Sequence, residues 1–145
     1  MKVSFIIVVL TAFLASCSRA PSSVDLFSKT TELLDQYLNT NALGAESAML
    51  QLERYTHDCE KAGYRSGLGD VKLDQAYGAV YARLYLVEKT LGKQQAADQY
   101  YQRASEYLVQ TYATAGQPRP TPEQIREQIE GVDRYFVEPQ WKNQK

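Results

Sequence analysis

Apolar residues recur at steps of three and four between Leu73 and Leu91, which is the spacing of one face of an α-helix. The positions of this row are Leu73, Ala76, Val80, Leu84, Val87 and Leu91. A second row, formed by Tyr77, Tyr81 and Tyr85, steps by four beside the first. The apolar face is therefore wide, which predicts a helix that contacts neighbours on two sides.

A second helix is predicted to fold back on the first. Gly92 follows the last periodic residue, at the position where a glycine in the left-handed conformation commonly ends a helix. The pattern resumes near Gln94 and continues to Tyr112. Its inner positions are Ala97, Tyr100, Tyr101, Ala104, Leu108 and Tyr112. The two alanines would let the backbones of the hairpin approach closely.

Two more helices are predicted before this hairpin. The first covers residues 24–38 and the second covers residues 42–62, with a break at Asn39-Thr40-Asn41. The inner positions of the first are Phe27, Leu34 and Leu38, with Leu33 and Tyr37 at the edge. The buried positions of the second are Ala45, Ala48, Met49, Leu52, Tyr55 and Cys59.

A last helix is predicted to begin at Thr121, which can act as the N-cap before Pro122, while Gln124 reaches back to the cap amide. Its apolar stripe consists of Ile125, Ile129, Val132 and Phe136, which extends the helix to about Tyr135. Residues 137–145 form a tail that contains the only tryptophan, Trp141. That side chain either packs back on the domain or stays exposed as a contact.

These elements predict an all-α domain of about five helices, stacked as antiparallel hairpins over residues 24–136. The central hairpin resembles a tetratricopeptide repeat, a two-helix unit of about 34 residues. The residues that carry the resemblance are Tyr81, Leu84, Gly92, Ala97, Tyr101 and Ala104. Tyr85, Glu88 and Val109 depart from the pattern, and only one unit is visible. Because such repeats stack to bury a continuous core, the flanking helices must supply the stacking.

The N-terminal segment has the pattern of a secretory signal. Lys2 precedes an almost entirely apolar run over residues 3–14, which is too short to be a permanent membrane span. Leu14-Ala15-Ser16-Cys17 then resembles the lipobox of bacterial lipoproteins. The resemblance implies that residues 1–16 are removed and that Cys17 carries the lipid. Residues 17–23 would be a short lipidated tether, so the domain should stay close to the membrane.

Ser18 stands where an aspartate would favour retention in the inner membrane, which by analogy favours the outer membrane, facing the periplasm, in a diderm cell. Lys2 is one of the 16 basic residues, so the mature chain keeps 15 against 17 acidic ones. Both signs are interspersed, whereas nucleic acid requires a clustered basic face. Nucleic acid is therefore not an expected partner.

The sequence predicts no catalytic residues, metal site or cofactor. His57 and Cys59 diverge on a helix and cannot share an ion, and Cys59 lies on the apolar stripe. Carboxylate pairs occur, for example Asp70 with Asp74, but on helices they usually form solvated faces. A hydrolase would need carboxylates that converge in a cleft.

Tyrosine is the unusual component, with 11 residues in 145. A tyrosine ring buries apolar area while its hydroxyl stays wet, which suits both an interface and a packed seam. If packing does not consume them, Tyr77, Tyr81 and Tyr85 are candidates for a partner-binding surface. Tyr64 and Arg65, in a glycine-rich segment, are candidates for a contact loop.

The leading functional hypothesis is a membrane-anchored lipoprotein that acts as an adaptor or assembly factor for an envelope protein. The alternative is a module that binds a small ligand or peptidoglycan in a tyrosine-lined groove. A pocket with convergent polar groups would favour the ligand, and an open apolar groove would favour the protein partner.

Overall fold

The computed structural model describes residues 23–61 and 69–143, with side chains for residues 28–61 and 73–143. Over these residues the chain is all-α, as predicted, with five α-helices and one short 3₁₀ helix. The helices are α2 (Ser23–Leu38), α3 (Ala42–Lys61), α4 (Gly69–Thr90), α5 (Gln94–Thr114), α6 (Pro122–Glu130) and η1 (Gln140–Asn143). The predicted signal segment, the lipobox with Cys17, and the loop candidates Tyr64 and Arg65 lie outside the described residues.

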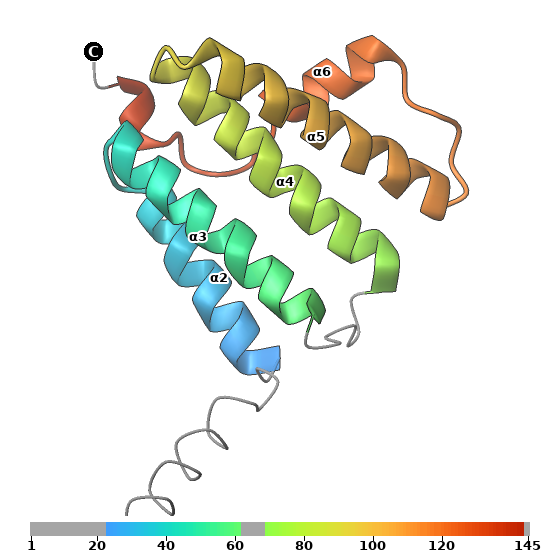
Figure 1. Ribbon diagram of the computed structural model, residues 1–145, viewed down its shortest axis with the longest axis horizontal. Helices are drawn as coiled ribbons and strands as arrows, with labels where there is room; N and C mark the ends of the chain where they lie inside the picture. Colours follow the sequence, from blue (N-terminus) through green and yellow to red (C-terminus); the bar gives the residue numbers. More distant parts are fainter. Residues whose placement is uncertain (1–22, 62–68, 144–145) are drawn as a thin grey trace, which may run out of the picture.

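The helices are arranged as two antiparallel hairpins, α2 with α3 and α4 with α5 (Figure 1). α3 packs against α4, so the hairpins lie side by side, and α6 crosses α4 and α5. After α6 the chain runs back to α3, where η1 packs. The last residues of the chain therefore tie its second half to its first.

The α4–α5 turn forms as its sequence predicts. Gly92 has φ +73°, a left-handed conformation that glycine adopts without a steric penalty. The amide of Lys93 donates to the carbonyl of Glu88 at 2.9 Å, and the amide of Gly92 donates to the carbonyl of Lys89 at 3.2 Å. These two hydrogen bonds satisfy carbonyls that the end of a helix leaves free.

The core lies where α4 meets its neighbours. Ala97 and Ala104 of α5 are fully buried, which confirms the predicted close approach of the two backbones. The largest buried side chains come from several helices and from the tail: Trp141, Tyr37, Leu33, Met49, Leu84, Ile129 and Val87. Burial of each such aliphatic or aromatic side chain contributes about 1.5–3 kcal/mol to folding.

The inward face of α2 differs from the prediction. Leu33 and Tyr37, expected at the edge, are 1% and 0% exposed, whereas Leu34 and Leu38 are only half-buried. The helix is therefore rotated about its axis relative to the predicted stripe. This rotation places the Tyr37 hydroxyl in the interior, where it donates a hydrogen bond to Asp133 at 2.7 Å.

α6 is shorter than predicted. Its capping box forms, since the Thr121 side chain accepts from the Gln124 amide and the Gln124 side chain accepts from the Thr121 amide. However, the helix ends at Glu130 instead of Tyr135, and residues 131–136 form turns. Phe136, predicted on the inner stripe, is 52% exposed. Because the helix ends early, the turn places Asp133 within hydrogen-bond distance of Arg83 and Tyr37.

Candidate functional site

The predicted tyrosine row forms an internal seam. Tyr77, Tyr81 and Tyr85 are 4%, 6% and 8% exposed. Tyr77 stacks on Tyr107 of α5 with ring centroids 5.0 Å apart, and Tyr81 stacks between Tyr107 and Tyr100 at 5.7 and 6.0 Å. These rings pack inside the domain. The row therefore does not line an open partner-binding surface, which was one of the two possibilities that the sequence left open.

The hydroxyl edge of this seam is closed by carboxylates of α3. Tyr77 donates to Glu60 at 2.6 Å, and Tyr81 donates to Glu53 at 2.8 Å. Burial, followed by the hydrogen bond to Glu53, raises the pKa of Tyr81 to about 12. Burial and Glu60 likewise raise the pKa of Tyr77 above its ordinary value. These phenols stay protonated donors at neutral pH and hold α3 against α4.

The residues considered for metal binding are separated. Cys59 is buried, and burial raises the pKa of its thiol. His57 lies at the surface with Nδ1 3.2 Å from the Tyr77 hydroxyl. Within the described residues, no group of three or more histidine, cysteine or acidic side chains could hold a metal ion.

A buried charge cluster joins α2, α4 and the turn after α6, and the sequence analysis missed it. Arg83 Nε donates to Asp133 Oδ1 at 2.9 Å, while Tyr37 donates to Asp133 Oδ2 at 2.7 Å. The guanidinium also lies 5.7 Å from the Tyr37 ring centre and 5.6 Å from that of Phe136. The signal was present as a charged residue inside the apolar pattern of α4, but its partner lies 50 positions away.

A second buried acid lies near the C-terminal end of α4. Glu88 is 3% exposed and faces Glu46 of α3, with Lys93 Nζ 3.6 Å from its Oε2 atom. Burial, followed by the neighbouring Glu46 carboxyl, raises the pKa of Glu88 although Lys93 opposes the shift. Lys93 also binds Glu46 at 2.7 Å, so one exposed ammonium serves both carboxyls.

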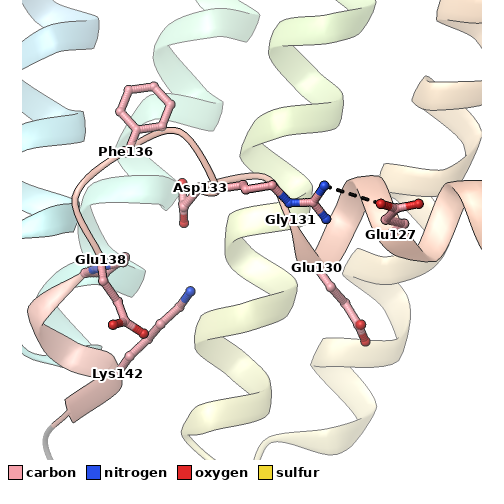
Figure 2. A pocket seen from close by; sticks show the side chains of 9 residues that line it. Glu127, Glu130, Gly131, Asp133, Phe136, Glu138 and Lys142 are labelled. Carbon is pink, nitrogen blue, oxygen red and sulfur yellow. Dashed lines mark hydrogen bonds and ion pairs between the residues drawn. The ribbon is translucent and has the colours of Figure 1, made fainter.

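A cleft of about 410 Å³ opens beside the turn after α6 (Figure 2). Four carboxylates line it: Glu127, Glu130, Asp133 and Glu138. Glu127 is ion-paired with Arg134 at 3.3 Å, and Asp133 belongs to the buried charge cluster. The other two are exposed, whereas a general acid at neutral pH is usually a desolvated carboxyl. The cleft therefore brings four carboxylates together, as a hydrolase would need. It does not bury Glu130 or Glu138 in the apolar surroundings that general acid catalysis needs.

A groove of about 500 Å³ lies between α4, α5 and α6. Its apolar lining consists of Gly78, Ala79, Ala82, Leu108, Ile129, Val132 and Tyr135. Amide side chains stand at its rim, among them Gln75, Gln124 and Gln128. The α4 side of the groove consists of small residues, of which Gly78 and Ala82 are buried and Ala79 is half-buried.

Three consecutive large apolar residues are exposed next to this groove. Tyr135, Phe136 and Val137 are 92%, 52% and 82% exposed, and together we call them the apolar turn. Phe136 was predicted on the inner stripe of the last helix, and the exposure of these three residues was not predicted. Among the described residues only one other large apolar side chain, Leu43, is comparably exposed.

Comparison with protein-family models, with curated proteins and with solved structures found no match to this chain. Among the described helices, none combines the length and the hydropathy that a membrane crossing requires.

Proposed function

We propose that this chain is a lipid-anchored adaptor of the bacterial envelope, held to the membrane through Cys17 and binding a protein partner in the groove between α4, α5 and α6. The groove is the observation that carries the proposal. The anchor is supported by the lipobox-like quartet before Cys17 and by the apolar run that precedes it. In a diderm cell the site of action is the outer membrane, on the side that faces the periplasm.

The lining of the groove supports a protein partner more than a small ligand. Its α4 side is made of the small residues Gly78, Ala79 and Ala82. The two charged residues in its lining, Glu127 and Arg134, are paired with each other at 3.3 Å. Amphipathic helices bind to such grooves through a row of apolar side chains, and the amides of Gln75 and Gln124 can bond the polar edge of such a segment. The buried tyrosine seam offers no open stacking platform, which removes the main support for peptidoglycan or sugar binding.

The anchor is tested by the mass of the protein extracted from its native membrane. We expect cleavage before Cys17 and a mass increase that corresponds to attached acyl chains, with recovery in the membrane fraction. Cys17→Ala should abolish the mass increase and release the chain from the membrane. An unmodified Cys17 in well-expressed protein would contradict the anchor.

The groove is tested by site-specific photocrosslinking in the native envelope. A crosslinker at Gln75, on the rim, should capture a discrete partner, whereas one at the exposed Gln110 of α5 should not. Ala79→Arg fills the groove and should reduce capture at Gln75 at least several-fold. Ala113→Arg, at an exposed site outside the groove, is the matched control. Equal capture from both positions, or capture unaffected by Ala79→Arg, would contradict the proposal.

A further inference from the structure

The apolar turn is largely exposed, although Tyr135 also lines the groove and Phe136 the cleft. In the view of Figure 2 the chain arches between α6 and η1, with Phe136 on the outer side of the arch and Glu138 and Lys142 on the inner side. The exposed fractions of Tyr135 and Val137 are 92% and 82%, so these side chains contact little of their own domain. Exposed apolar side chains at a turn suit insertion into the headgroup layer of a membrane.

The position of the turn is fixed by the buried charge cluster. Asp133, two residues before Tyr135, is bonded to Arg83 and Tyr37, and Trp141 packs edge-on against Tyr37 at 5.7 Å. Both ends of the arch are therefore held to the second half of α2. Because Tyr37 follows Ser23 by four turns of helix, this anchoring point lies about 21 Å along α2 from the start of the helix.

The short tether limits how far the domain can lie from the membrane. Six residues, 17–22, separate the proposed lipid attachment from α2, and an extended chain of that length spans at most about 20 Å. If α2 lies along the membrane, the tether and the apolar turn both reach the same surface.

We propose that the apolar turn is a second membrane contact, which inserts Tyr135 and Val137 at the headgroup level and orients the anchored domain. The inference rests on the proposed lipid anchor. Tyrosine suits this depth because its ring is apolar and its hydroxyl stays hydrated. The nearby charges are mixed, with Arg134 and Lys142 against Glu130 and Glu138, so the contact depends on apolar insertion and changes little with salt.

The contact can be tested independently of lipidation. The mature chain, with Cys17 replaced by an N-terminal histidine tag, is bound to phosphatidylcholine vesicles that contain nickel-chelating lipid. A maleimide fluorophore is placed at Val137→Cys, and Cys59 stays unlabelled because it is buried. The control is Ala113→Cys on α5, which lies on the other side of α4 from α2 and α3 (Figure 1).

We expect nitroxide lipids to quench the probe at residue 137 several-fold more than the probe at residue 113, with iodide showing the opposite order. Tyr135→Ser with Val137→Ser should lower vesicle affinity several-fold at low nickel-lipid content, whereas Leu43→Ser, another exposed apolar site, should not. Helical circular dichroism checks that each variant folds.

Equal quenching at both sites and unchanged affinity would overturn the second contact even if Cys17 proves to be lipidated. If the double serine variant instead abolishes crosslinking at Gln75 without changing vesicle binding, the apolar turn belongs to the protein-binding surface, and the membrane inference is wrong.

Discussion

Arg83 and Asp133 form an ion pair of 2.9 Å in which the two side chains are only 8% and 3% exposed. The pair links the middle of α4 to the turn after α6, and Tyr37 adds a hydrogen bond from α2. Two charges taken out of water are tolerated here because each is bonded to the other and the carboxylate accepts a second bond. The pair thus determines how the C-terminal segment crosses the helices.

Asp133→Ala should destabilise the fold strongly. The substitution leaves the Arg83 guanidinium buried without its carboxylate, which typically costs about 3–5 kcal/mol. Urea denaturation followed by circular dichroism measures the change. The surface pair formed by Arg134 and Glu127 is the matched control, and Arg134→Ala should cost less than about 1 kcal/mol. Similar losses for the two variants would show that the buried pair has no special role.

Trp141→Ala should also destabilise the fold, by about 3–5 kcal/mol, because removal of a fully buried aromatic side chain leaves a cavity. Val137→Ala, four residues earlier and 82% exposed, should change stability by less than about 0.5 kcal/mol. Tryptophan fluorescence gives a direct check on the native protein. Emission at the wavelength of a hydrated indole, with free access to acrylamide, would contradict the packing of the tail.

The sequence was sufficient for the elements and insufficient for their long-range contacts. Helical periodicity, the glycine at the α4–α5 turn and the capping box at Thr121 are local signals, and all three are confirmed. The bounds of α2, α3 and α5 agree with the prediction within two residues, whereas α6 ends five residues early. The buried face of α3 was also predicted, apart from Tyr55, which is half-buried. Local spacing decides these features because the interacting groups are neighbours in the chain.

Tyr37 and Phe136 show why the rest was missed. Tyr37 was placed at the edge of α2 because its spacing fits two faces almost equally well, and only Asp133, 96 positions away, decides between them. Phe136 fits the stripe of α6, but the helix ends earlier and the side chain is released to the surface. The groove and the apolar turn follow from this three-dimensional arrangement, so no local pattern could have predicted them.

The tyrosine seam predicts a loss of stability in alkali. The folded pKa of Tyr81 is about 12, above the ordinary value near 10, because burial and Glu53 disfavour the phenolate. A raised folded pKa contributes stability that is fully present below pH 10 and is lost as pH rises through about 12. Phenolate absorbance should therefore show fewer titrating tyrosines at pH 11 in the native protein than in urea.

Tyr81→Phe tests whether the phenol that resists titration is that of Tyr81. It removes one resistant phenol from the titration and should cost about 1 kcal/mol at neutral pH through loss of the hydrogen bond to Glu53. Identical native and unfolded titration curves would contradict the buried seam.

The buried Glu88 predicts a pH dependence of stability above the ordinary glutamate pKa. Burial and the facing Glu46 carboxyl raise its folded pKa, whereas Lys93 opposes the shift. The protonated form is thus favoured in the folded state, and its contribution to stability is lost as pH rises from the ordinary glutamate value through the raised pKa. Glu88→Gln mimics the protonated acid and should remove this loss.

The expected result is a difference in the free energy of unfolding between Glu88→Gln and the wild type that grows with pH and then becomes constant. Urea titrations from pH 4 to pH 8 measure it, and the other carboxyls cancel because both proteins contain them. Glu138→Gln, at an exposed position, should give no such trend. A difference that stays constant or falls with pH would mean that Glu88 is ionised in the folded state, with Lys93 as its effective counterion.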